Sequence, residues 1–324
     1  MNLDIGPGKP GPYEKDDTMK KDEPIFYGGQ AVMEGILMRG QKAYAMAVRK
    51  PNGEITIIEK PISSITERYR ILKLPLIRGI VALGSSLSLG FYALSRSADI
   101  AFEGIDEPES KFEKWLNEKL GDRLNDILKV FAMVLAVVLA LGLFMLLPAF
   151  IGSFIEDGNL TGIVEGLVRI VIFVGYVFLI SRSKDIQRVF GYHGAEHMAI
   201  NCHEKKMPLT FENVASFSRL HKRCGTSFVF VVMVVAMVMF MIIQVDGILM
   251  RFLSRILLLP VIAAISYEIS VKWAGKRDNF IVRAITAPGM LMQRLTTAVP
   301  DEGQIEVAIT ALNRCLEQEQ PSEA

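Results

Sequence analysis

Long stretches without charge constrain this chain of 324 residues more than any other feature. Residues 130–155 carry no charged side chain, and neither do residues 224–245. Residues 163–180 and 248–269 are two further apolar stretches, each interrupted by few charges. A helix of about 20 apolar residues is long enough to cross a hydrocarbon core of about 30 Å. Hydrophobic residues make up 51% of the chain, so the sequence predicts a mainly α-helical, polytopic membrane protein with about four transmembrane helices.

The distribution of lysine and arginine predicts how these helices are oriented. Basic residues gather in 182–224 and after residue 271, whereas the short loops 156–162 and 245–250 contain none. Because basic loops remain in the cytoplasm, we expect both termini of the chain to be cytoplasmic. An even number of crossings then leaves residues 74–94 as a re-entrant or interfacial helix, or as a kinked pair of short helices.

A few charged residues lie inside the apolar stretches. Glu165 and Arg169 are four residues apart, so we expect them to form an ion pair on one helix. Arg251 and Arg255 also share a helical face near a membrane surface, and we expect both to extend toward the lipid head groups.

The region before the first apolar stretch divides into a tail and a small β-element. Residues 1–24 are polar and rich in Pro and Gly, so we expect a disordered tail. Residues 43–48 and 54–60 resemble strands, and Asn52-Gly53 between them predicts a small cytosolic β-hairpin. Residues 27–41 contain four glycines, which indicates a tight turn or a ligand-binding loop.

The chain therefore divides into five segments. The tail is residues 1–24, the glycine-rich segment with the hairpin is 25–73, and the interfacial or re-entrant helix with a cytosolic linker is 74–129. The four-span membrane domain is 130–270 and contains the cytosolic histidine-rich loop 182–224. The cytosolic part with amphipathic helices is 271–324.

All four histidines of the chain lie within residues 190–224, a window that begins FGYHGAEHMAINCHEKK. Its centre is His193-Gly-Ala-Glu196-His197. Residues four apart share one face of a helix, so the imidazoles of His193 and His197 are expected to converge on one point. This is the H-x-x-E-H pattern, in which two His bind a metal and the Glu polarises a water molecule. The alternative is an ordinary helix with solvated or capping His and Glu side chains.

A hydrolytic zinc site needs a third protein ligand and one open position. We expect Glu268 as that ligand, because it lies at the cytoplasmic end of the last apolar stretch, at the depth of the histidine window. Glu204 is the second choice. Glu196 is then the general base, which takes a proton from water. Three polar residues are expected to orient the imidazoles from behind: Asp185, Asn201 and Asp278.

The other histidines and two cysteines of the window offer the alternative of a separate, softer metal site. Its members would be His203, His221, Cys202 and Cys224. Their spacing matches no zinc-ribbon pattern, which argues against this site.

Four ordered motifs resemble those of the YqhQ-like family of bacterial integral membrane proteins: residues 27–41, 192–204, 223–228 and 288–309. The resemblance extends from about residue 24 to 316. It implies residence in a bacterial inner membrane, and proteins of this family are commonly labelled predicted metal-dependent enzymes. It brings no substrate or reaction. His203 departs from the family pattern, which argues against this residue as a ligand.

Two functions follow from these observations. The first is a divalent-metal-dependent hydrolase with zinc held by His193, His197 and Glu268 at the cytoplasmic membrane surface, acting on a lipid or a peptide. The second is a non-catalytic membrane factor that binds, stabilises or regulates other membrane proteins. The expected partners are membrane lipids and another membrane protein, as substrate or client. Nucleic acid is not expected, because the net charge is only +1 and the basic residues follow the loops.

Overall fold

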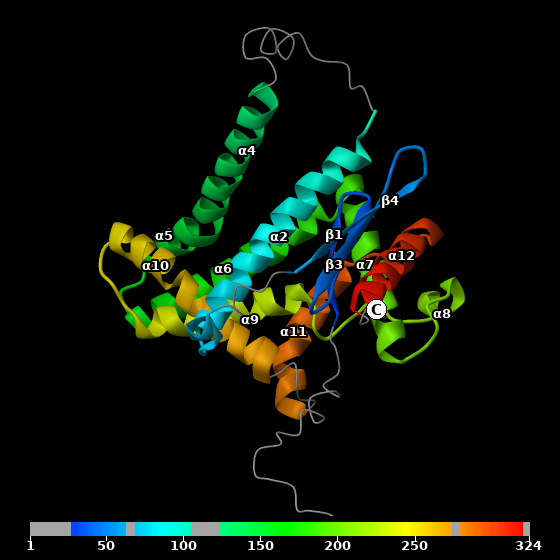
Figure 1. The fold of residues 1–324 in the computed structure, drawn as a ribbon. Helices are drawn as coiled ribbons and strands as arrows, with labels where there is room; N and C mark the ends of the chain where they lie inside the picture. The colour runs from blue at the N-terminus through cyan, green and yellow to red at the C-terminus, as the bar shows by residue number, and fades with distance from the viewer. Residues whose placement is uncertain (1–26, 63–68, 105–122, 274–278, 320–324) are drawn as a thin grey trace, which may run out of the picture.

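The computed structural model of the chain describes residues 27–62, 69–104, 123–273 and 279–319. The predicted tail, residues 1–24, lies outside these ranges, as does Asp278. Four strands come first in the chain: β1 Gly28–Val32, β2 Gly35–Arg39, β3 Ala43–Arg49 and β4 Ile55–Pro61. The helices follow (Figure 1): η2 Arg70–Lys73, α2 Ile77–Ala101, α4 Arg123–Leu141, η3 Gly142–Leu146, α5 Leu147–Gly152, α6 Gly158–Ile180, α7 Lys184–Glu204, α8 Phe211–Ala215, α9 Gly225–Ile242, α10 Ile248–Tyr267, η4 Glu268–Trp273, α11 Phe280–Thr296 and α12 Glu302–Glu319.

The strands form one antiparallel sheet in the order β1-β2-β3-β4. The predicted hairpin is confirmed, because β3 pairs with β4 and Gly53 takes the positive φ, 88°, that such a turn favours. The β-element is nevertheless larger than expected. The glycine-rich segment, for which we expected a turn or a ligand loop, forms β1 and β2, which are joined by the two residues after Val32. Residue Gly35 lies opposite Val32 in this second hairpin.

Helices cover both faces of the sheet. One set of alternating strand side chains packs against α7 and α12: Ile36, Met38, Ala45 and Ala47. The opposite set packs against the second half of α2: Val32, Leu37, Tyr44, Met46 and Val48. Because successive side chains of a strand point to opposite faces, β2 and β3 can be buried on both sides of the sheet. The sheet is thus the middle of three layers (Figure 1).

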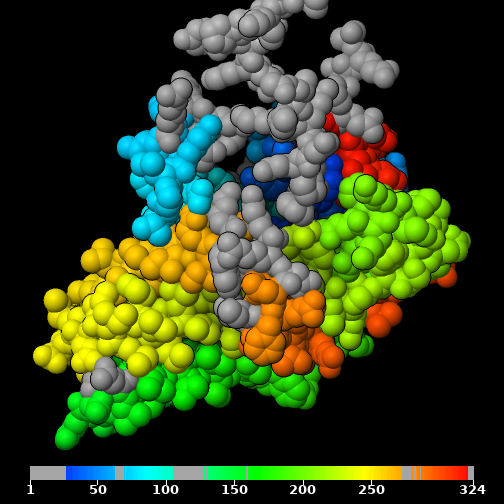
Figure 2. All heavy atoms as spheres, turned by 90° about the horizontal axis from the view of Figure 1, so that it is seen from below, coloured from blue at the N-terminus to red at the C-terminus, as the bar shows by residue number. Residues whose placement is uncertain are grey.

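Within the described ranges, five helical stretches are long and apolar enough to cross a membrane: Ile77–Ala101, Val130–Gly152, Leu160–Ile180, Gly225–Ile242 and Ile248–Val271. The four predicted spans are among them. Residues 77–101 form the single continuous helix α2 rather than a kinked pair of short helices, and by length and composition α2 is a fifth candidate. Figure 2 shows the surface of α10, in yellow, on one side of the molecule and the blue sheet with the red α12 on the other.

A buried ion pair joins two of the apolar helices, α6 and α10. Glu165 of α6 accepts hydrogen bonds from Arg255 of α10, at 3.1 Å for the closest pair, and both side chains are fully buried. The predicted pair between Glu165 and Arg169 is therefore wrong, and so is the prediction that Arg255 extends to the head groups. Arg169 instead donates from Nε to the carbonyl of Phe144 at 2.8 Å. Both guanidinium groups lie over the ring of Phe240, at 5.0 Å for Arg169 and 4.1 Å for Arg255.

Because Glu165 and Arg255 are buried together, we expect replacement of Glu165 alone to destabilise the protein more than replacement of both residues. Glu165→Leu leaves Arg255 buried without its carboxylate, which we expect to cost about 3–5 kcal/mol of stability. Adding Arg255→Met removes the stranded charge and should recover much of that loss. The measurement is the thermal midpoint of the detergent-purified protein by fluorescence-detected size exclusion, with the exposed Leu167→Ala on the same helix as control. A double variant less stable than Glu165→Leu would contradict the pairing.

Candidate metal centre

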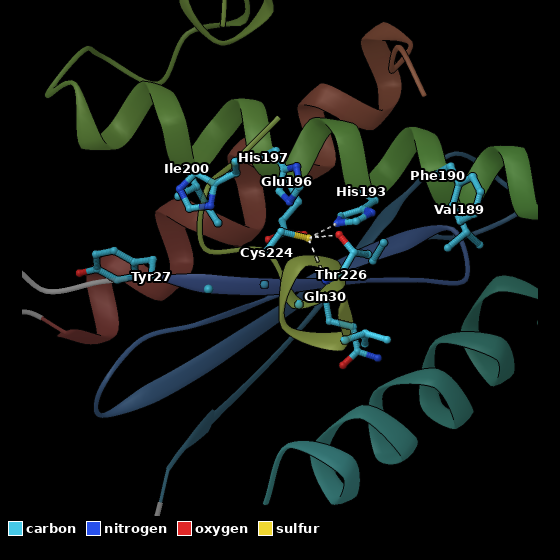
Figure 3. Close-up of a pocket in the computed structure, with 16 residues that line it drawn as sticks. Tyr27, Gln30, Val189, Phe190, His193, Glu196, His197, Ile200, Cys224 and Thr226 are labelled. Carbon is cyan, nitrogen blue, oxygen red and sulfur yellow. Dashed lines mark hydrogen bonds between the residues drawn. The ribbon is translucent and has the colours of Figure 1, made fainter. Parts of the chain in front are cut away.

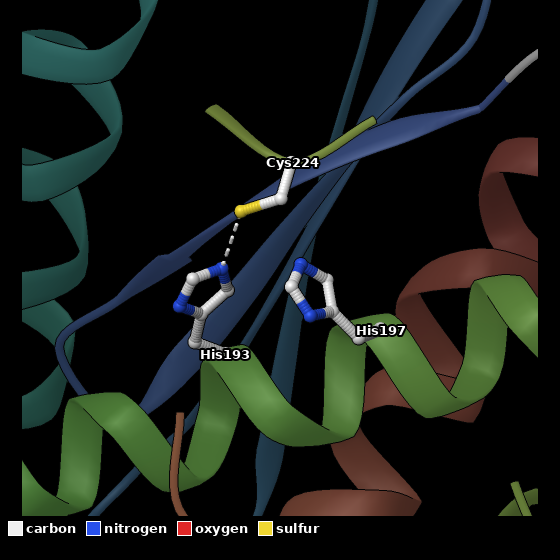
Figure 4. A group of neighbouring side chains, drawn as sticks. All are labelled: His193, His197 and Cys224. Atoms are coloured by element: carbon white, nitrogen blue, oxygen red, sulfur yellow. Dashed lines mark hydrogen bonds between the residues drawn. The ribbon is translucent and has the colours of Figure 1, made fainter. Parts of the chain in front are cut away.

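Helix α7 brings the two predicted histidines together. His193 and His197 project from one face of the helix, as their spacing predicts, and their ring centroids are 4.4 Å apart (Figure 4). His197 is buried and His193 is half-buried. Burial lowers the pKa of His197, so its ring is neutral near pH 7 and keeps a lone pair for a ligand.

A glycine between these histidines allows another part of the chain to pass close to α7. A Cβ on Gly194 would lie 2.2 Å from the carbonyl oxygen of Ala298. The backbone N–H of Ala298 donates to the carbonyl of Phe190 at 2.8 Å. The segment after α11 is therefore held against α7 beside the histidines, and only glycine at 194 leaves room for it.

Backbone carbonyls fix the orientation of both imidazoles. Nδ1 of His193 lies 2.8 Å from the carbonyl oxygen of Thr296, and Nδ1 of His197 lies 2.6 Å from that of Arg219. Arg219 in turn donates to the carbonyl of Thr297 at 2.6 Å, so the two supports are tied to each other. A carbonyl oxygen can only accept, so each Nδ1 donates its proton and Nε2 is the ring nitrogen that remains for a ligand. This is the support that metal-binding histidines usually have.

Cys224 completes the group. Its Sγ lies 3.3 Å from Nε2 of His193. Cys224 caps the N-terminus of α9, where the backbone N–H of Thr226 lies 3.4 Å from the sulfur. Each of the three side chains offers one ligand atom, and these atoms all lie within 4.8 Å of one another.

These residues fit a zinc ion. Bond lengths of about 2.0–2.1 Å to nitrogen and 2.3 Å to sulfur place the ligand atoms of a tetrahedral site about 3.5 Å apart. The separation of 3.3 Å between His193 and Cys224 is close to that value. Two imidazoles and a thiol are donors that zinc prefers.

Glu196 lies beside this group, as the sequence pattern predicts. The side chain is buried on α7, and it accepts a hydrogen bond from the backbone of Gly29 in β1. Burial raises the pKa of Glu196, while the nearby His193 and His221 act in the opposite direction. A carboxyl group whose pKa is moved toward neutrality is better suited to accept and return a proton.

The histidines, Cys224 and Glu196 line one pocket of about 330 Å³ (Figure 3). Strand β1 forms one wall with residues Gly28 to Ala31, and the first turn of α9 forms another. The helices also contribute apolar side chains to the lining: Val189, Phe190, Ile200 and Val229. This volume is at the lower end of the range of small-molecule sites.

His221 and Glu204 belong to the support of the pocket. The backbone of His221 exchanges two hydrogen bonds with the Gln293 side chain of α11, at 2.9 and 2.8 Å. The His221 ring lies 3.3 Å from the carboxylate of Glu204, which also binds Arg223. Burial and these partners act in opposite directions on the Glu204 pKa, and the result is a lowered value. Glu204, the second choice for a ligand, therefore holds the loop before α9.

Glu268 does not join the histidines. Its carboxylate accepts two hydrogen bonds from the guanidinium of Arg78 on α2, one of them at 2.7 Å from Nε. The third place in the group is taken by Cys224 instead. Of the residues expected to orient the imidazoles, Asn201 donates to the carbonyls of Ser218 and Leu220 and so acts on the loop. The signal that could have identified Cys224 is its presence in the same window as every histidine.

Comparisons with known proteins agree on one family. A family described as "Protein of unknown function (DUF1385)" matches residues 74–318, a range that contains all three residues of the His/Cys group. The chain is 34% identical over 308 residues to the uncharacterized protein YqhQ of Bacillus subtilis (strain 168). That match covers 94% of this chain and 96% of the relative. No solved structure matches the chain.

The contact between β1 and Glu196 gives a test with a neighbouring control. A Cβ on Gly29 would lie 2.7 Å from Cγ of Glu196, whereas one on Gly28 meets nothing within 4 Å. We expect Gly29→Ala to lower the thermal midpoint, because overpacking a filled site costs about 1–3 kcal/mol, and Gly28→Ala to leave it unchanged. The decrease in thermal midpoint caused by Gly29→Ala should be smaller in a Glu196→Ala background, because the side chain that the new Cβ would meet is then shorter. An equal loss in both backgrounds would contradict the geometry.

Proposed function

The chain belongs to the DUF1385 family, and we propose that it is a zinc-dependent membrane hydrolase whose metal is held by His193, His197 and Cys224. The observation that carries the proposal is the arrangement of the two imidazoles. Each Nδ1 lies against a backbone carbonyl, and the ligand atoms of both rings lie within 4.8 Å of a thiol. Burial of these polar side chains costs free energy, and binding of a metal ion would compensate for that cost.

The roles of the side chains follow from this arrangement. When bound, zinc supplies Lewis acidity to a water molecule and to the substrate carbonyl. His193, His197 and Cys224 would hold the metal, and the pocket beside them would receive the water and the substrate. Glu196 accepts the proton of the attacking water and returns it to the leaving group. The apolar lining limits the access of bulk water.

We place the protein in the inner membrane of a bacterium, with its lipids as neighbours and both termini in the cytoplasm. The support is the excess of Lys and Arg in 182–224 and after residue 271. Fluorescent protein fused to the C-terminus should then fluoresce, because it matures in the cytoplasm. Dark fusions, together with an active periplasmic reporter at the same position, would reverse this orientation.

Metal analysis tests the ligand set. Purified wild-type protein is expected to carry about one zinc per chain, and His193→Ala, His197→Ala and Cys224→Ser to lose it. His203→Ala is the matched control, since His203 lies on the same helix with its ring against Tyr27. Glu268→Ala should also retain the metal, because its carboxylate binds Arg78.

The outcomes of the metal analysis separate the alternatives. Retention of zinc by Cys224→Ser, with loss in both histidine variants, would remove the cysteine from the set. Full retention by all three variants would refute the metal centre.

The second candidate function is a non-catalytic membrane factor with a structural metal. It is favoured by the number of segments that meet at the site: α7, the loop before α9, the end of α11 and β1. A metal there would fasten these segments together without chemistry, as structural zinc does.

Glu196→Gln distinguishes the two functions. This substitution removes the proton acceptor and keeps the size of the side chain, so zinc content should remain that of wild type while hydrolysis stops. Membranes from cells that produce wild-type or Glu196→Gln protein can be compared by mass spectrometry. Species that accumulate only with Glu196→Gln are expected if the protein is a hydrolase. Identical profiles, with zinc present in both proteins, would favour the structural role.

A further inference from the structure

Strand β1 is an edge strand, and its free edge can be assigned residue by residue. Among the strands that the structure describes, β1 pairs only with β2, and Val32 lies opposite Gly35 across a connection of two residues. In a hairpin with a two-residue connection, the two residues that flank the connection form both backbone hydrogen bonds with each other. Hydrogen-bonded and non-hydrogen-bonded pairs then alternate along the two strands. Gln30 is therefore bonded to β2, whereas the backbone groups of Gly29 and Ala31 point away from it.

These outward groups face the pocket of the metal centre. Both Gly29 and Ala31 line it, and Glu196 accepts the hydrogen bond of the Gly29 backbone. Within the part of the chain that the structure describes, no hydrogen bond is found to the N–H of Ala31 or to the carbonyls of Gly29 and Ala31. Three unpaired backbone groups thus lie in a row beside a candidate metal centre.

The pocket is bounded opposite β1 by the start of α9. Cys224, Thr226 and Val229 line that side, and α7 lies along the pocket with His193 and Glu196 (Figure 3). The space between β1 and α9 therefore has a strand edge on one side and the thiol on the other. The chemical group that matches a row of alternating donors and acceptors is another extended backbone.

We propose that an extended polypeptide segment adds to the edge of β1 across this pocket, so that the substrate of the centre is a peptide. The proposal rests on the proposed hydrolase function and names its substrate class. A peptide strand accepts from the Ala31 N–H and donates to the carbonyls of Gly29 and Ala31. An acyl chain offers no such groups, and it would leave the three backbone groups unpaired.

The reaction at this position is hydrolysis of a peptide bond. Water adds to the carbonyl carbon, and Glu196 accepts one proton from it. The C–N bond then breaks, and Glu196 returns the proton to the departing nitrogen. The products are a carboxylate and an amine, and no other reactant is needed.

Synthetic hydroxamates test the proposal on the full-length, zinc-loaded protein in detergent. Acetohydroxamate alone measures access to the metal, and a tripeptide hydroxamate adds the backbone. Two further tripeptide probes carry one N-methyl group, each on a different one of two successive amides. Alternate amides of a strand point to opposite sides, so only one of the two methyl groups can face β1. Affinities are measured by isothermal titration calorimetry.

We expect one N-methyl probe to bind about tenfold more weakly than the parent, and the other to bind as well as the parent, because one hydrogen bond is lost. Ala31→Pro should weaken the parent tripeptide similarly, since proline lacks the N–H and is tolerated on an edge strand. Ala31→Val is the matched control, as it adds a comparable volume and keeps the N–H. Acetohydroxamate should bind equally to all of these proteins.

The possible results keep the two proposals separate. Equal binding of all three tripeptide probes, with acetohydroxamate bound, would overturn the peptide proposal and leave the metal centre intact. So would tighter binding of octanohydroxamate than of the tripeptide, because that result identifies an acyl chain as the occupant. If acetohydroxamate does not bind and zinc is absent, the hydrolase proposal fails. In that case the tripeptides without the hydroxamate group test the strand edge, and the measurement is again the difference in affinity between the parent peptide and its two N-methyl forms.

Discussion

The candidate site depends on a closed circuit of hydrogen bonds. It runs from His193 to the carbonyl of Thr296, passes through Thr297 to Arg219, and returns from the Arg219 carbonyl to His197. Each contact joins segments that are distant in sequence, so neither imidazole can rotate without breaking the circuit. Because the rings are held in this way, little conformational entropy would be lost if both were to bind a common ion.

The parts of the fold that the sequence predicts are those governed by local periodicity. Uncharged stretches of membrane length identify the long helices, and the spacing of His193 and His197 places both rings on one face of α7. The turn at Asn52-Gly53 predicts a hairpin because its backbone requirement is also local. The glycines before it misled the prediction. Gly29 and Gly35 allow close approach within a layered sheet, where a Cβ would meet Glu196 and the backbone of Ala47.

The parts that could not be predicted depend on tertiary packing. Glu165 and Arg169 satisfy the spacing of a helical ion pair, yet Glu165 binds Arg255 from another helix. Glu268 lies at a suitable end of its helix, but α2 presents Arg78 to it. In both cases the partner is decided by which helices pack together. The carbonyls that orient the imidazoles are invisible to sequence reasoning for a different reason, because every residue has one and only the fold selects Thr296 and Arg219.

The position of Cys224 links the site to the membrane helices. It is the residue before α9, one of the candidate spans, and its sulfur faces the histidines of α7. Gln293 of α11 connects the same two regions, since it binds the backbone of His221 and the hydroxyl of Ser227 in α9. A displacement of α9 along its axis would therefore move Cys224 relative to the imidazoles, because the circuit through Thr296 and Arg219 holds those rings on α7. The geometry of the candidate centre and the packing of the apolar helices are consequently coupled.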